Sequence, residues 1–136
     1  MACSEAPTTL DIELPHDPTA PGIARRAMED FLTDRCPPEV AQTVLMAGSE
    51  LVTNAIRHTS GSCRLTVRLL DSEVVVEVRD NDSTLTDRAY LGDDLIGRGL
   101  GMLQSISERW GIERHPDGGK VVWAEISTSA LQDTDG

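Results

Sequence analysis

Four side chains that could bind a ligand lie in the segment SELVTNAIRH at residues 49–58. On a helix with about 100° per residue, Glu50, Asn54 and Arg57 fall within about 60° of one another, and His58 lies about 40° beyond Asn54. A carboxylate one turn from a carboxamide suits a general base beside an oxygen ligand for a hard cation such as Mg²⁺. The same face also suits a solvated surface with polar pairs one turn apart, so both interpretations stay open.

A further candidate, Asp80, ends the segment EVVVEVRD at residues 73–80. In a strand, Asp80 shares one face with Val74, Val76 and Val78, so valines that face the core would aim the carboxylate inward. A buried carboxylate needs hydrogen-bond donors. Backbone amides of the following turn would serve, and so would the exocyclic amino group of a purine.

Glycines mark the third candidate segment, GRGLGM at residues 97–102, which we expect to open a helix that runs through Arg109. The unpaired N–H groups and the positive dipole end of a helix start favour phosphate oxygens, and glycine permits their close approach. Tight packing alone would also explain the glycines. The polar segment from Asn81 to Gly97 is long enough to close over a bound nucleotide.

The elements that position these groups follow from hydrophobic periodicity. Alternating residues predict a strand at 9–14, a hairpin at 63–80 and a final strand from Lys120 to Ile126. Helical spacing predicts helices from Gly22 to Asp34 and from Glu39 to His58. We therefore expect one α+β domain at residues 9–128, with loose tails at 1–8 and 129–136. Its architecture would be a two-layer sandwich, with helices on one face of a mixed, mostly antiparallel sheet.

Composition and charge exclude several classes of protein. The 136 residues include 12 Lys and Arg against 23 Asp and Glu, which gives a net charge of −11 and disfavours direct binding of nucleic acid. The apolar runs are too short for a membrane span, and the start has no pattern of a signal peptide. The three scattered cysteines indicate free thiols in a reducing compartment, so we expect a cytoplasmic protein.

Taken together, Glu50-x-x-x-Asn54, Asp80 and Gly97-x-Gly99-x-Gly101 resemble the N box and the two glycine boxes of the Bergerat-fold ATPases in order and spacing. DNA gyrase, histidine kinases and the MutL repair proteins share that fold. The short chain and the segments ELVTNAIRH, GRGLGM, RWG and GGKVVWAEI resemble more narrowly the bacterial anti-sigma-factor serine kinases. The resemblance covers residues 10–127 and implies the histidine kinase-like ATPase type of α+β sandwich.

By this resemblance, the chain would bind ATP or ADP with Mg²⁺. Glu50 would be the base that takes the proton of a substrate serine, Asn54 would hold Mg²⁺ against the phosphates, and Asp80 would accept the adenine amino group. Further nucleotide contacts are expected from Arg57, His58, Gly97, Arg98, Gly99, Leu100 and Gly101. Because phosphoryl transfer depends mainly on positioning and charge neutralisation, this small set would suffice.

The resemblance implies an anti-sigma regulatory factor with protein serine kinase activity toward an antagonist protein. The partners would be a sigma factor and that antagonist, and an exposed sheet edge makes a homodimer plausible. One departure favours an alternative, a nucleotide-responsive or nucleotide-free binding module with weak or no catalysis that only sequesters a protein partner. The first glycine box normally reads Asp-x-Gly-x-Gly, but both glycines are missing from Asp80-Asn-Asp-Ser-Thr84. The retained Glu50 favours the kinase, and the ATP-binding half of a histidine kinase is a third, less favoured interpretation.

Four other residues are expected to be structural. Trp110 and Trp123 should lie in the core, and Cys63 should act as a small buried hydrophobic residue. Lys120 should lie in a turn before the last strand and face solvent.

Overall fold

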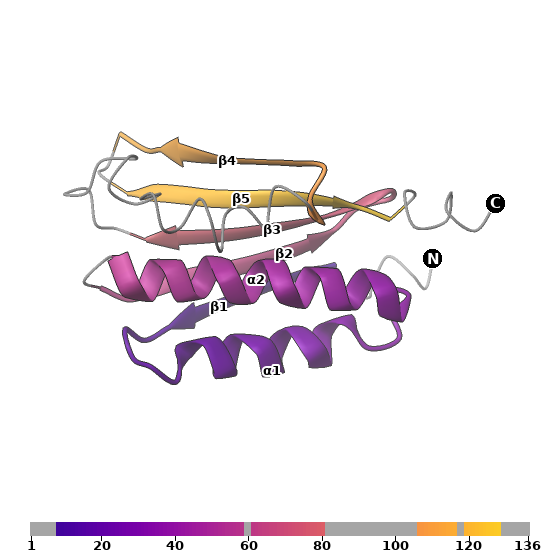
Figure 1. Cartoon of the computed structure of the whole chain (residues 1–136), viewed down its shortest axis with the longest axis horizontal. Coiled ribbons are helices and arrows are strands. Elements are labelled where there is room, and N and C mark those ends of the chain that lie inside the picture. The colour runs from indigo at the N-terminus through magenta and orange to yellow at the C-terminus, as the bar shows by residue number, and fades with distance from the viewer. Residues whose placement is uncertain (1–7, 59–60, 81–105, 117–118, 129–136) are drawn as a thin grey trace.

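Two helices cover one face of a five-stranded sheet in the computed structural model of the chain, which describes residues 8–58, 61–80, 106–116 and 119–128 (Figure 1). This arrangement confirms the predicted α+β sandwich. The elements are β1 (Thr9–Leu14), α1 (Ala20–Leu32), α2 (Pro38–His58), β2 (Cys63–Leu69), β3 (Glu73–Asp80), β4 (Arg109–Arg114) and β5 (Lys120–Ser127).

The strands follow the order β1-β2-β3-β5-β4, and all four pairings between the described strands are antiparallel. The hairpin of β2 and β3 therefore lies where the alternation predicted it. The central strand, β3, pairs with β2 on one side and with β5 on the other, and α2 packs against all three of these strands. Consequently, both ends of β3 are fixed by neighbours on either side and by a helix above.

Two predicted boundaries are wrong. The first helix spans Ala20–Leu32 rather than Gly22 to Asp34, and it begins earlier because Pro21 falls in the first turn, where a proline needs no hydrogen-bond donor. The helix predicted to run through Arg109 cannot do so, since Arg109–Arg114 is strand β4, paired with β5. The burial of β4 does not alternate cleanly, and a glycine lies inside it, so periodicity gave no signal for this edge strand.

The core lies between the helices and the inward face of the sheet. Its fully buried members include Met28 of α1, Leu51 of α2, Leu65, Val76 and Val122. Trp110 packs partly buried against this core, as predicted. The prediction for Trp123 is wrong, because it lies on the opposite face of the sheet from Val122 and Ala124, where its ring covers Gly111 of the neighbouring strand.

Close contact between α2 and α1 depends on Gly48. A Cβ at this position would lie 2.5 Å from Sδ and 2.8 Å from Cε of Met28, and 3.7 Å from Cγ1 of Val76 on β3. Gly48 therefore lets α2 approach Met28 of α1, whereas the distance to Val76 is an ordinary van der Waals contact.

In the part of the chain that the structure describes, no helix is both long and apolar enough to span a membrane.

We expect Gly48→Leu to lower the free energy of unfolding by about 1–3 kcal/mol, because its side chain would collide with Met28 in a filled core. Met28→Ala should itself cost about 2–5 kcal/mol through the cavity that it leaves. The double variant should lose less than the sum of the single losses, because the new leucine fills that cavity. Urea denaturation of the four proteins measures this coupling, and additive losses would show that Gly48 and Met28 do not pack as described.

Candidate functional site

Three side chains lie in a row across one end of the sheet. The last residue of β3, Asp80, is paired with Cys63 of β2 on one side and with Lys120 of β5 on the other. The three share the inward face with Val78, and they are 2%, 3% and 0% exposed, respectively. The prediction that the strand aims the Asp80 carboxylate into the protein is therefore confirmed.

The predicted position of Lys120 is wrong. This lysine is the first residue of β5, and alternation places it on the same inward face as Val122 and Ala124. Its Nζ lies 3.4 Å from Oδ1 of Asp80, and both side chains are almost completely buried. The buried carboxylate thus has a charged donor from the chain itself, a third source beyond the backbone amides and the purine amino group considered from the sequence.

The charge of Asp80 also acts on its other neighbour. Burial, followed by the nearby negative charge of Asp80, raises the pKa of the Cys63 thiol to about 11. At neutral pH the thiol is therefore protonated and behaves as a small apolar group, as predicted. Of the two neighbours of Asp80, only Lys120 compensates its charge.

Helix α2 brings a second buried polar group to this end of the molecule. Asn54 is only 1% exposed, and neither its Oδ1 nor its Nδ2 has a hydrogen-bond partner among the described residues. The helix ends at His58, a few residues before Cys63, so its last turns lie at the same end of the molecule as the row across the sheet (Figure 1). An unsatisfied buried carboxamide is costly, so a bound polar group would be stabilised there.

The other residues of this helix face differ in exposure. Glu50, one turn before Asn54, is partly buried, and Arg57 is exposed. His58 is the last helical residue. The structure thus places Glu50 and Asn54 one turn apart on α2 and Asp80 at the end of β3. The other predicted contacts, Gly97, Arg98, Gly99, Leu100 and Gly101, lie outside the described residues, as does the segment 81–84 in which the glycines of the first box are missing.

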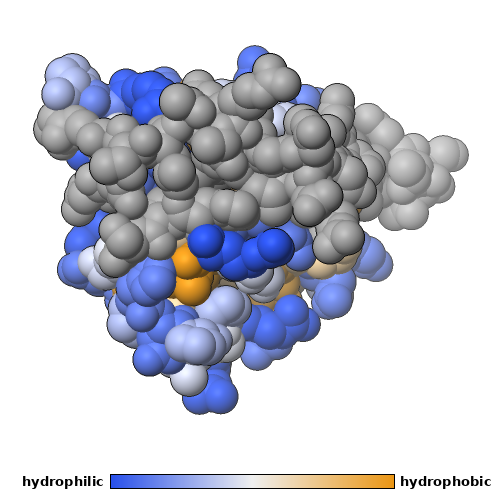
Figure 2. Space-filling model, turned by 60° about the vertical axis from the view of Figure 1, so that its left-hand side comes forward, coloured by the Kyte–Doolittle hydropathy of each residue, from blue (hydrophilic) through white to orange (hydrophobic). Residues whose placement is uncertain are grey.

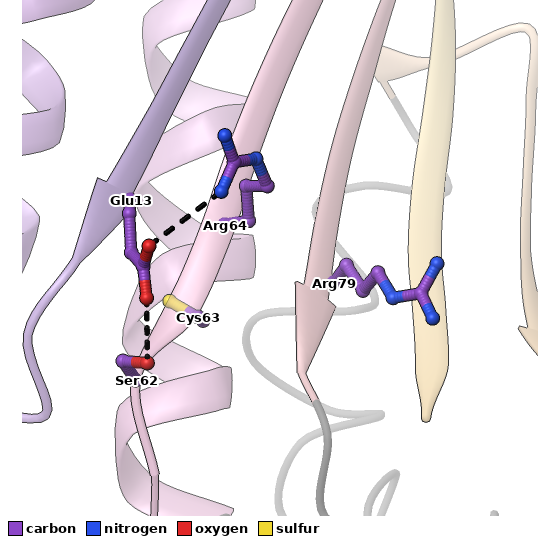
Figure 3. A pocket seen from close by; sticks show the side chains of 5 residues that line it. All are labelled: Glu13, Ser62, Cys63, Arg64 and Arg79. Carbon is purple, nitrogen blue, oxygen red and sulfur yellow. Dashed lines mark hydrogen bonds and ion pairs between the residues drawn. The ribbon is translucent and has the colours of Figure 1, made fainter. Parts of the chain in front are cut away.

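A separate cavity of about 310 Å³ opens beside β1 and β2 (Figure 3). Its side chains pair with one another: Ser62 Oγ donates to Glu13 Oε2 at 3.2 Å, and Arg64 lies 3.6 Å from Glu13 Oε1. Arg79 points away from this pair, toward β5. Because Arg64 and Glu13 are about half exposed or more, their attraction is largely screened, and this cavity makes a poor ligand site.

The part of the described surface that Figure 2 shows is mostly polar. In the view of Figure 2, hydrophilic side chains cover most of it, and hydrophobic colour is confined to small areas. Among the described residues, the large exposed hydrophobic side chains are Ile23 and Leu70. The open face of the sheet carries ion pairs such as Arg64 with Asp11 at 2.7 Å. The buried polar groups at the end of the sheet are therefore the best candidate for a functional site.

Comparisons with known proteins agree with this fold. A family model described as the histidine kinase-like ATPase domain matches residues 14–126. The structure is similar to the crystal structure of the RsbU and RsbW domains of Rv1364c from Mycobacterium tuberculosis, with a TM-score of 0.67 and 20% sequence identity. The match covers 88% of this chain and 32% of that one, so the chain spans about a third of that protein's length. No curated protein sequence matches the chain significantly.

We expect Lys120→Met to destabilise the fold by about 3–5 kcal/mol, because it leaves the buried Asp80 carboxylate without its cation. The double variant Lys120→Met/Asp80→Leu, which removes both charges, should be close to the wild type in stability. Guanidinium denaturation gives the three values. If Lys120→Met alone were as stable as the wild type, the ion pair would not be buried as described.

Proposed function

Because the chain belongs to the histidine kinase-like ATPase family, we propose that it binds ATP or ADP between the last turns of α2 and the end of β3. The observation that carries this proposal is the buried Asn54, whose carboxamide has no hydrogen-bond partner among the described residues. It lies at the same end of the fold as the inward carboxylate of Asp80. Buried polar groups of this kind fit a nucleotide, which presents an amino group at one end and oxygens at the other.

At the base end, Asp80 would accept the adenine amino group. Its burial supports this role, because a hydrogen bond to a carboxylate is strong where water is excluded. A carboxylate has two oxygens and about four lone-pair sites, and the ion pair with Lys120 is through Oδ1. The carboxylate can therefore engage both the lysine and the base.

At the phosphate end, the carboxamide oxygen of Asn54 would be a ligand of Mg²⁺. Among the described residues there is no group of three or more His, Cys, Asp and Glu that could hold a metal ion. Mg²⁺ that is bound together with a nucleotide takes most of its ligands from phosphates and water. A single side-chain oxygen from the protein is therefore enough for this mode of binding. Arg57, exposed one turn further along the helix, and His58 would contact the phosphates. The phosphate contacts of residues 97–101 are proposed from the sequence alone, because these residues lie outside the described part of the chain.

The partly buried Glu50 would act as the general base of a protein serine kinase. It lies one turn from Asn54, so it can accept the proton of a serine hydroxyl beside the phosphates. The metal, when bound, would neutralise charge on the phosphates, while Glu50 positions the hydroxyl. The fold similarity to a chain with an RsbW domain supports a role as an anti-sigma regulatory factor, with a sigma factor and an antagonist protein as partners.

The proposed domain covers residues 9–128. It would act in the cytoplasm, where sigma factors work. It would form a homodimer through one of the edge strands of the described sheet, β1 or β4. A second candidate function is a binding module that sequesters its partner without catalysis. The missing glycines in 81–84 favour it. Because such a module can still respond to nucleotide, phosphate transfer is what separates the two candidates.

We expect the wild type to bind MgADP and to melt at a higher temperature in its presence, because a ligand of the folded state stabilises that state. Asp80→Asn should weaken binding by about 10- to 100-fold, since a charged acceptor for the amino group is lost. Asp71→Asn, in an exposed turn, is the matched control. Isothermal titration measures the affinities, and circular dichroism verifies folding. Equal affinities in Asp80→Asn and the wild type would refute the assignment of the base.

Glu50→Gln should retain MgATP binding, because the substitution preserves size and hydrogen bonding, but it should slow phosphorylation of a serine-containing antagonist by about 100-fold or more. Glu39→Gln, at the exposed start of the same helix, should have no effect. Transfer of radiolabelled phosphate gives the rates. Unchanged transfer by Glu50→Gln would exclude Glu50 as the base, whereas nucleotide binding without transfer in the wild type would support the binding module.

A further inference from the structure

The buried Lys120 is the least expected feature of the site. A lysine that is 0% exposed has lost the hydration of its ammonium group, and its Nζ lies 3.4 Å from Oδ1 of Asp80. A purely structural pair is no better for stability than two apolar residues of similar size. The position of this lysine at the end of the sheet, next to the residue that we propose reads the base, therefore indicates a role in binding.

The two side chains present complementary hydrogen-bonding groups side by side. Asp80 and Lys120 are directly paired across β3 and β5, so both project from the same face of adjacent strands. A carboxylate only accepts hydrogen bonds, whereas an ammonium group has three donors and no acceptor. The end of the sheet thus offers one fixed acceptor and, 3.4 Å away, one fixed donor.

The neighbours of this pair do not supply an equivalent donor. On the other side of Asp80 lies Cys63, and burial together with the charge of Asp80 raises the pKa of its thiol, so it remains a weak, neutral group. On the other side of Lys120 lies Arg114, which is exposed. Among the paired residues of this row, Lys120 is the buried cation.

We propose that Lys120 is a specificity-determining residue that reads the base together with Asp80. This inference rests on the proposed function, in which Asp80 accepts the exocyclic amino group of adenine. The ring nitrogen N1 next to that amino group is an acceptor, and the Lys120 ammonium donates to it. Hypoxanthine and guanine have the opposite pattern, a carbonyl oxygen facing Asp80 and an N–H facing Lys120, so both contacts become repulsive.

The test removes each side of the proposed contact in turn. MgADP and the magnesium complex of 1-deaza-ADP, in which a C–H group replaces N1, are titrated into the wild type and into Lys120→Met. We expect the wild type to bind MgADP about 10- to 100-fold more tightly than the 1-deaza analogue, the discrimination typical of a second hydrogen bond to a base. Lys120→Met should bind the two with similar affinities, because the donor is gone. MgIDP should bind the wild type more weakly than either.

Each outcome decides the inference. An equal preference for MgADP in the wild type and in Lys120→Met overturns it, and so does a wild type that binds MgADP and 1-deaza-ADP equally. The second comparison needs no variant, so it still decides if Lys120→Met does not fold. If the wild type binds MgADP but does not discriminate, only the role of Lys120 is wrong. If it binds neither nucleotide, the proposed function is wrong and the inference falls with it.

Discussion

The buried carboxylate of Asp80 is the constraint on which the candidate site depends. A carboxylate with almost no exposure must be compensated, and the pairing of β3 with β5 places the ammonium group of Lys120 opposite it. This compensation requires both strands to be in register up to their ends. The same register turns Cys63 inward on the other side, where the charge of Asp80 is felt by the thiol. The buried charge of Asp80 therefore accounts both for its ion pair with Lys120 and for the raised pKa of the Cys63 thiol.

The site combines a well-packed core with polar groups that the core does not satisfy. Gly48 lets α2 lie close to α1, and from this helix Asn54 projects into a buried environment. Its carboxamide lacks partners among the described residues, which lowers stability unless a ligand supplies them. Uncompensated polar groups on rigid elements are typical of binding sites, because their hydrogen bonds are reserved for the ligand.

Much of this arrangement could be predicted from the sequence. The period of two through Val74, Val76 and Val78 indicated the inward position of Asp80, and a long apolar stripe at helical spacing predicted α2 almost to the residue. The family resemblance then connected Glu50, Asn54 and Asp80, and the matching family model confirms the family. These inferences succeed because burial on one face imposes a period that the sequence displays directly.

The errors have equally specific causes. Lys120 follows two glycines, and lysine is usually solvated, so its buried ion pair depends on a cross-strand neighbour 40 positions away that local patterns do not reveal. Trp123 looked like a core residue by its type, but its strand position places it over Gly111 on the open face of the sheet. An edge strand that is half exposed, as β4 is, has no strict alternation to detect.

The most direct test of the central claim is a crystal structure of the chain with MgADP. We expect the amino group of the base to lie within hydrogen-bonding distance of the Asp80 carboxylate, and the Asn54 carboxamide oxygen to coordinate the metal. Nucleotide bound elsewhere, for example in the cavity between Glu13 and Arg79, with Asp80 and Asn54 remote from it, would contradict the account.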